Sequence, residues 1–247
     1  SLASRKDARD AVLAARAAQR GWAGATAYNR GQVIYRIAEM LEGRRAQFEA
    51  EIESAEGCSA RRASAQVDAA IDRWVWYAGW SDKIAQVLGS SNPVAGPYFN
   101  FSVPQPTGVV AAIAPQRPSL LGLVSVVAPI IVSGISCVVV GWSVCALTAI
   151  TLGEVLATSD LPGGVVNILT GAPGEIGPWL ASHADVDALD LTGVVDDGVA
   201  TEMAVAAAET ITRVLPPTSP PDWSADPGLG RISAFVETTT VWHPQGV

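Results

Sequence analysis

The feature that most limits the fold of this chain is a run without a charged residue, between Arg117 and Glu154. The run covers positions 118–153 and is long enough to cross a lipid bilayer as a helix. However, prolines and glycines interrupt it, Val138–Val140 is a short β-branched stretch, and no basic cluster flanks either end. We therefore favour a buried core over a membrane protein. Other parts of the chain then have to enclose the run.

A parallel sheet is the core that the sequence predicts. From Gly108 to Leu169, short β-branched runs alternate with apolar segments of helical length, which is typical of βαβ units. We therefore expect an α/β fold with a Rossmann-like core over residues 108–215.

An N-terminal helical layer is expected over residues 1–89, because apolar side chains recur there at helical spacing. We predict two or three amphipathic helices up to about Glu56, with Thr26 as the N-cap of one of them. A further helix is predicted from about Ala63 to Val87. Its tryptophans are interpreted as packing groups, because they would face different sides of that helix.

Two strands are expected outside the core. Residues 90–107 contain turn signals followed by the alternating stretch Tyr98–Val103, which predicts a protruding hairpin. Residues 216–230 are rich in proline and are interpreted as a linker. Residues 231–247 follow, and the alternation from Arg231 to His243 predicts one strand, which needs a sheet edge to join.

Composition excludes some classes of partner. A net charge of -8 argues against nucleic acid and against anionic membranes, because both require a basic face. The three cysteines form no pair with metal-ligand spacing, so we expect no metal site and reduced, mostly buried thiols. The first residues show no secretion signal, so a cytoplasmic location is expected.

Four motifs along the chain carry a family resemblance. They are Pro106–Pro115, then Ala128-Pro129 with Gly134, then Leu161–Gly171, and finally Leu191–Gly193. In this order and spacing they resemble the aldehyde dehydrogenase superfamily, and the segment Phe235–Trp242 resembles that family's closing oligomerisation strand. The resemblance implies a truncated, degenerate member without the catalytic domain, similar to the non-catalytic second module of two-module aldehyde dehydrogenases.

The resemblance also implies a degraded nucleotide site. Gln116 and Arg117 stand where the family has the Trp-Asn pair whose amide is an oxyanion-hole donor. Val140 and Ser143 replace the lysine and glutamate that hold the adenosine ribose. Gly193 and Gly198 keep the family's glycine spacing near the phosphates. Asp196 and Asp197 lie between these glycines, and we interpret the two carboxylates as a helix cap. No cofactor is therefore expected, and residual NAD(P) binding is disfavoured.

The family's catalytic groups have no counterpart. Neither its nucleophilic cysteine nor its glutamate base is matched, and Val214–Pro217 stands where the base motif would begin. Cys58, Cys137 and Cys145 follow no such motif, and burial disfavours a thiolate. We therefore expect no enzymatic activity from this chain on its own.

The function that we favour is a non-catalytic subunit that assembles with a complete aldehyde dehydrogenase, or with itself, and stabilises or organises it. The hairpin and tail strand supply the expected contacts, which involve Tyr98, Phe99, Phe101, Phe235, Glu237, Thr239 and Val241. One alternative is an active NAD(P)-dependent oxidoreductase of reduced size. Another is a protein that binds a different small ligand in a vestigial crevice, with Arg117 contacting an anion.

Overall fold

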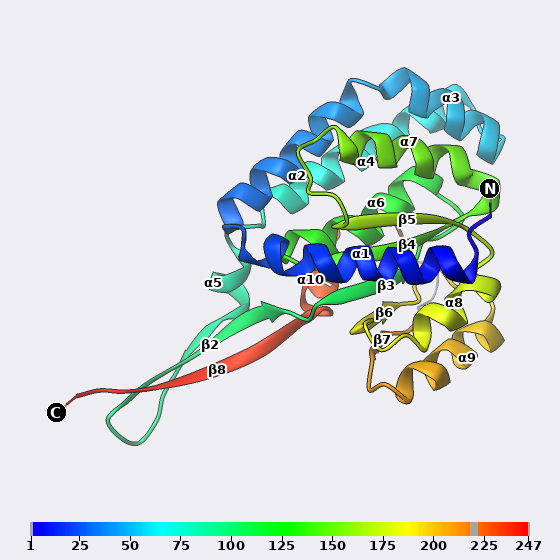
Figure 1. Ribbon diagram of the computed structural model, residues 1–247. Helices are drawn as coiled ribbons and strands as arrows, with labels where there is room; N and C mark the ends of the chain where they lie inside the picture. Colours follow the sequence, from blue (N-terminus) through cyan, green and yellow to red (C-terminus); the bar gives the residue numbers. More distant parts are fainter. Residues whose placement is uncertain (1, 218–221, 247) are drawn as a thin grey trace.

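The computed structural model describes residues 2–217 and 222–246, so residues 218–221 of the expected linker lie outside the described residues. Within these ranges the chain forms a parallel sheet covered by helices on both faces (Figure 1). A separate antiparallel sheet extends from one side as an arm. The expected α/β fold with a protruding hairpin is confirmed.

The parallel sheet has five strands in the order β5-β4-β3-β6-β7. Its members are β3 (Val109–Ile113), β4 (Ser136–Trp142), β5 (Val166–Gly171), β6 (Ala188–Asp190) and β7 (Arg213–Leu215). All neighbours are parallel, and the central strand β3 pairs with β4 on one side and β6 on the other. The β-branched runs therefore form the strands that the sequence predicts.

Side chains of the central strands alternate between two cores. One core holds Val110 and Val139 together with one layer of helices: α2 (Ala27–Glu42), α3 (Arg45–Glu56), α4 (Ala60–Ala78), α6 (Ser119–Val132) and α7 (Ala146–Ala157). The other holds Val109 and Val138 together with the second layer: α1 (Arg5–Gly24), α8 (Pro173–Ala181) and α9 (Asp197–Ala208). Three short helices complete the fold: α5 (Ile84–Leu88), the 3-10 helix η1 (Ser143–Cys145) and α10 (Gly230–Ser233).

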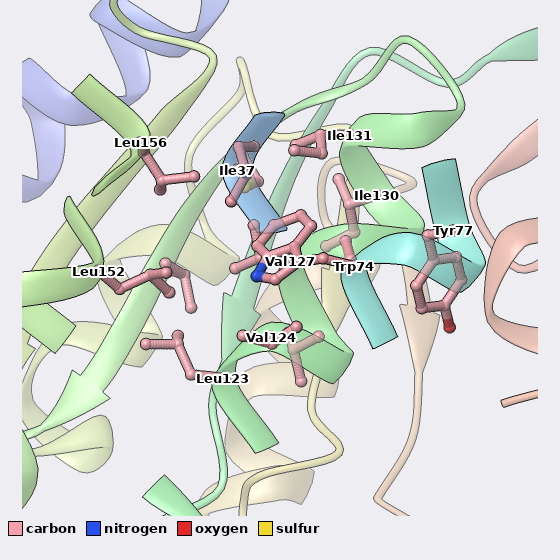
Figure 2. Packing of buried hydrophobic residues seen from close by; sticks show 14 of the residues in the cluster. Ile37, Trp74, Tyr77, Leu123, Val124, Val127, Ile130, Ile131, Leu152 and Leu156 are labelled. Atoms are coloured by element: carbon pink, nitrogen blue, oxygen red, sulfur yellow. The ribbon is translucent and has the colours of Figure 1, made fainter. Parts of the chain in front are cut away.

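The uncharged run forms α6, β4 and most of α7. Every residue of α6 is buried, because the helix lies between the sheet and α4. Trp74 of α4 packs beside Val127 and Ile130 in this region (Figure 2). Among the described residues, no helix is both long enough and apolar enough to cross a membrane. Burial therefore explains the absence of charge in α6 and β4, whereas Val144, Leu147 and Ile150 of the same run are exposed.

The helical layer follows the expected pattern with one error. Thr26 caps α2, since its Oγ1 accepts a hydrogen bond from the Asn29 amide at 3.2 Å. The single helix predicted from about 63 to 87 is wrong, because α4 ends at Ala78 and the chain turns through Gly79 before α5. The turn folds Trp80 back so that its ring lies 5.4 Å from that of Trp76.

The arm is a three-stranded sheet in the order β1-β2-β8, formed by β1 (Ser90–Asn92), β2 (Tyr98–Pro106) and β8 (Val236–Pro244). The expected tail strand therefore joins the hairpin of its own chain. Its predicted start at Arg231 is wrong, because α10 comes first. Burial of Ile232 and Phe235 in the main core holds this segment out of the strand.

We expect the Trp74→Ala variant to lower the free energy of unfolding by about 3–5 kcal/mol, because it leaves a large cavity between α4 and α6. Urea unfolding followed by circular dichroism measures the change. Tyr28→Ala, at a side chain that is 68% exposed, is the matched control and should change stability by less than about 0.5 kcal/mol. Equal losses in both variants would contradict this account of the core.

Candidate functional site

The candidate site is the edge of the parallel sheet at which the strands end. Strand β3 lies between β4 and β6, so the chain leaves the sheet in opposite directions on either side of β3. In open α/β folds, ligands bind at the carboxyl ends of the strands at such a switch point. The loops after β3, β4 and β6 therefore define the crevice.

The loop after β4 packs against the loop after β3. The Trp142 indole Nε1 donates to the carbonyl oxygen of Ala114 at 2.9 Å, and the Cys145 Sγ donates to that of Gln116 at 3.4 Å. Val140 is wholly buried, whereas Ser143 is exposed. Val140 and Ser143, where the resemblance implies the ribose-binding pair, thus lie at this edge, but Val140 offers no polar group and points into the core.

The loop after β3 places Gln116 half-buried and Arg117 exposed, so only the backbone of Gln116 is used internally. The N-terminus of α6 then follows, and two side chains from the helical layer cap it. Glu56 Oε1 accepts from the Ser119 amide at 2.7 Å, and Gln66 Oε1 accepts from the Leu120 amide at 2.8 Å. These caps were missed from the sequence, because Glu56 and Gln66 lie far from α6 along the chain.

The loop after β6 approaches the end of β3 closely. The Gly193 amide donates to the Ile113 carbonyl oxygen at 3.1 Å, and a Cβ at Gly193 would lie 2.3 Å from the Ala114 carbonyl carbon. Asp196 caps α9, since its Oδ1 accepts from the Gly198 amide at 2.8 Å and the Val199 amide at 3.0 Å. The interpretation of Asp196 as a structural cap is therefore correct.

A buried ion pair lies beside the crevice. Asp190, at the end of β6, is 0% exposed and pairs with Arg231 of α10. Arg231 also donates through Nη1 to Thr192 Oγ1 at 3.1 Å and through Nε to the Ser125 carbonyl oxygen at 3.1 Å. The pair fastens the segment before β8 to the core, and no local sequence pattern predicts it because 41 residues separate the partners.

A second arginine holds the same segment. Arg73 of α4 donates through Nη2 to the carbonyl oxygens of Trp223 at 2.6 Å and Ala225 at 3.0 Å. A cavity of about 310 Å³ between these residues also borders Thr192 and Arg231. Burial raises the pKa of the nearby Tyr77 to about 12, and its buried hydroxyl has no hydrogen-bond partner. Segment 222–233 is therefore packed onto the core rather than extended as a linker.

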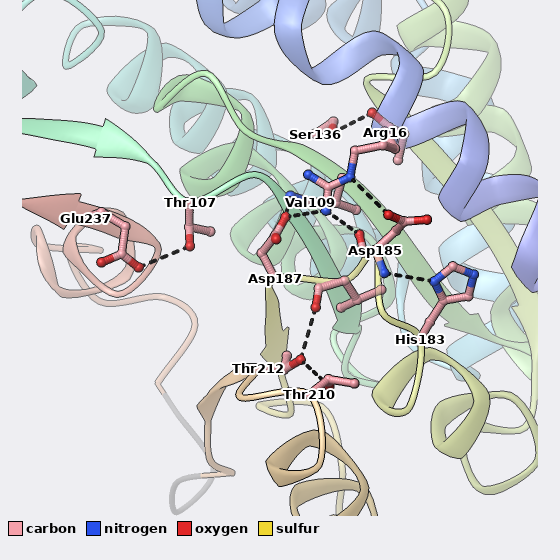
Figure 3. Close-up of polar contacts among 12 residues, drawn as sticks. Arg16, Thr107, Val109, Ser136, His183, Asp185, Asp187, Thr210, Thr212 and Glu237 are labelled. Atoms are coloured by element: carbon pink, nitrogen blue, oxygen red, sulfur yellow. Dashed lines mark hydrogen bonds and ion pairs between the residues drawn. The ribbon is translucent and has the colours of Figure 1, made fainter.

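The opposite edge of the sheet has a polar cluster that is structural (Figure 3). Asp187 Oδ2 accepts from Arg16 Nη2 and from the Val109 amide, both at 2.7 Å. His183 belongs to a loop there, and its Nδ1 accepts from the Asp185 amide at 3.1 Å. These residues lie at the end of the sheet away from the crevice.

The thiols do not form a reactive cluster. Burial raises the pKa of Cys137 to about 12, and burial followed by the charge of Glu56 raises the pKa of Cys145. Cys58 is half-buried. In the described part of the chain, no group of three or more His, Cys, Asp or Glu side chains is placed to hold a metal ion.

The arm brings together most of the predicted oligomerisation residues. Side chains alternate across a strand, so the register places Phe99, Phe101, Glu237, Thr239 and Val241 on one face. Tyr98 lies on the other face, with its ring 5.7 Å from that of Trp242. Phe235 is 0% exposed in the main core, so it does not lie on the arm surface as expected.

Comparisons with known proteins give a consistent result. The model of the aldehyde dehydrogenase family matches residues 1–216. Cytosolic aldehyde dehydrogenase 1 of Elephantulus edwardii is 33% identical over 217 residues, which are 86% of this chain and 42% of that protein. Human retinal dehydrogenase 2 is 32% identical over 179 residues, which are 72% of this chain and 34% of that protein.

A solved structure agrees with these matches. Betaine aldehyde dehydrogenase of Staphylococcus aureus, in complex with NAD+, has a TM-score of 0.81 and 27% identity over 87% of this chain and 42% of that chain. The chain therefore spans less than half the length of the relatives that it matches.

We expect Arg231→Met to lower the free energy of unfolding by about 3–5 kcal/mol, because it leaves the Asp190 carboxylate buried without its partner. The double variant Arg231→Met/Asp190→Leu should lose less than the sum of the two single variants. Urea unfolding of all four chains gives the coupling free energy. Additive losses would mean that the ion pair does not fasten α10 to the core.

Stability should also fall in alkali because of Cys137. The pKa of this thiol rises from 9.0 to about 12 on folding. Its contribution to the free energy of unfolding is therefore complete below pH 9 and is lost as the pH rises from 9 towards 12. For this one group the loss at pH 10 is about 1.4 kcal/mol. Unfolding measured from pH 8 to pH 10 should show this slope in the parent chain and a smaller one in Cys137→Ala. Parallel curves would contradict the burial of the thiol.

Proposed function

The chain belongs to the aldehyde dehydrogenase family, and we propose that it is a non-catalytic member that assembles with a complete aldehyde dehydrogenase and stabilises or organises it. One observation carries the proposal. The chain's own carboxylates accept from the first amides of α6 and α9 at the switch point, whereas the arm keeps an open strand edge and an aromatic face in the described chain.

The residues of the crevice do not fit a dinucleotide. A pyrophosphate binds to free amides at a helix N-terminus. Here a carboxylate, Glu56 or Asp196, already accepts from the first amides of α6 and α9 and would repel a phosphate. Trp142 uses its one side-chain donor on Ala114, and Val140 has none. NAD+ is bound by the betaine aldehyde dehydrogenase, but these contacts argue against it here.

The described side chains also offer no activated nucleophile. Aldehyde oxidation through a thioester needs a thiolate with a base beside it. The raised pKa values of Cys137 and Cys145 favour the neutral thiol, and Cys137 lies inside the sheet. His183 lies at the opposite edge, and His243 lies on the arm. These positions support a role without chemistry.

The arm supports assembly. Phe99 is 47% exposed, and its ring lies 5.3 Å from that of Phe101, so part of one face is aromatic and open to solvent. Aromatic side chains of this kind are enriched at protein interfaces. The arm also leads away from the globular part, where a partner has access to it (Figure 1).

We expect the purified chain to form no NADH from aldehydes and NAD+, and to give no binding heat when titrated with NAD+, because its helix N-termini are already capped. A complete aldehyde dehydrogenase under the same conditions is the positive control. NADH formation that disappears in Cys145→Ser would contradict the proposal and would favour an active enzyme of reduced size.

We also expect the chain to co-purify with a complete family member when the two are co-expressed. Phe99→Asp should weaken this association at least about tenfold, because it buries a charge at the interface. Leu147→Asp on α7 is the matched control, since Leu147 is 64% exposed and lies outside the arm. Equal effects of the two variants, or no association with any complete member, would refute the assembly role.

A further inference from the structure

A groove with a volume of about 900 Å³ lies between the start of α1 and the end of α8. Helix α8 packs between α1 and α9, so the groove lies on the opposite side of α8 from α9 (Figure 1). Small-molecule sites in proteins enclose about 300–1,000 Å³, so the groove has the size of a binding site. None of the residues described above for the crevice or the arm lines it.

The groove combines apolar and basic groups. Ala8 and Leu180 line it and are buried, and Trp179 lines it with 42% of its surface exposed. The basic groups come from the first two turns of α1, and they belong to Arg5, Lys6 and Arg9. A ligand that fits this lining needs both an apolar part and a negative charge.

Arg5 is held in place and keeps its donors free. Its Cζ lies 3.5 Å from the centroid of the Trp179 ring, so the guanidinium is stacked on the indole. Stacking uses the face of the guanidinium, whereas its N–H groups lie in its plane. Among the described residues, no acceptor pairs with these N–H groups. Two parallel N–H groups of this kind match the two oxygens of a carboxylate.

The charges around the groove leave one positive charge without compensation. Asp10 accepts from Arg9 Nε at 3.0 Å and from its Nη2 at 2.9 Å. Hydrogen bonds at the N-cap, assisted by the charge of Lys6, lower the pKa of Asp7, so an ionised carboxylate stays beside Lys6. The charge that remains is that of Arg5. The groove therefore favours a ligand with a single negative charge over a polyphosphate.

His183 supplies a donor on the opposite wall of the groove. Its Nδ1 accepts from the Asp185 amide, so Nε2 carries the hydrogen of the neutral ring. Nε2 lies on the far side of the ring from Asp185 (Figure 3), and no described acceptor pairs with it. The Asp185 carboxylate is 3.8 Å from Arg16 Nε, so that pair accounts for its charge.

We propose that the groove binds an organic carboxylate with an apolar body. The carboxylate lies between Arg5 and His183, and the apolar body lies along Trp179 and Leu180. The head group matches the one free charge and the paired donors of Arg5, and burial of the apolar body adds hydrophobic stabilisation. The site is separate from the crevice and from the arm, so the inference does not depend on the proposed function.

Calorimetry of the purified chain with octanoate and with 3-phenylpropionate tests the proposal. We expect saturable binding at one site for at least one of these acids, and the comparison distinguishes an alkyl body from an aromatic one. The amide of the acid that binds has the same apolar body without the charge, and it should bind at least about tenfold more weakly. Binding of neither acid, or equal binding of an acid and its amide, would overturn the proposal.

Variants of α1 test the role of Arg5. Arg5→Met should weaken binding at least about tenfold, because it removes the charge and the donors. Arg20→Met is the matched control, since Arg20 is exposed on the same helix outside the groove and the change in net charge is the same. Arg5→Lys keeps the charge without the planar donors and should bind with intermediate affinity. Circular dichroism checks that each variant folds. Equal effects of Arg5→Met and Arg20→Met would mean that binding follows net charge, and would overturn the site.

NMR spectra of the indole N–H groups locate the ligand without changing Arg5. The signal that is absent from Trp179→Phe identifies Trp179 among the eight tryptophans. The bound acid should shift this signal, because its apolar body lies along the ring, and it should leave the indole signal of the buried Trp22 in place. A bound acid that shifts other indole signals and leaves that of Trp179 unchanged would place the ligand elsewhere and overturn the proposal.

Discussion

The burial of α6 is the constraint on which the rest of the structure depends. Its 14 residues are all buried, so the helix needs cover on every side. The sheet covers one side, and α4, supported by α2 and α3, covers another. The helical layer is therefore required by the uncharged run. The caps from Glu56 and Gln66 also fix α6 along its axis, because they satisfy amides that no helical partner can reach.

Sequence periodicity was sufficient for most of the helices and strands, and it was insufficient for the contacts between them. Strands β3, β4 and β5 and the cap at Thr26 follow from local patterns, since each depends on neighbours in the chain. The break at Gly79 was missed, because apolar spacing continues across it. Phe235 continues the alternation of β8, but its burial depends on the main core. The pair Asp190–Arg231 joins distant segments, so no local pattern could predict it.

The candidate site, like the fold, could be predicted only in part. The resemblance placed Val140, Ser143 and Gly193 at the correct edge of the sheet, because family motifs mark the strand ends. It could not indicate that Trp142 donates to Ala114 or that Glu56 caps α6, since these contacts join residues that are far apart along the chain. At this edge the chain's own carboxylates, Glu56 and Asp196, occupy the N-terminal ends of α6 and α9.

The pairing of β2 with β8 also bears on how the chain is synthesised. Ser102 and Thr240 are hydrogen-bonded across a separation of 138 residues, and β8 follows every other described strand in the chain. On the ribosome, the parallel core can form while β2 still lacks its neighbour. Contacts of such long range form slowly, so β2 is exposed to other chains during translation. The donors of β2 that face β8 belong to its odd-numbered residues, so Pro104 and Pro106 do not protect this edge, and it stays open to other chains until β8 is made.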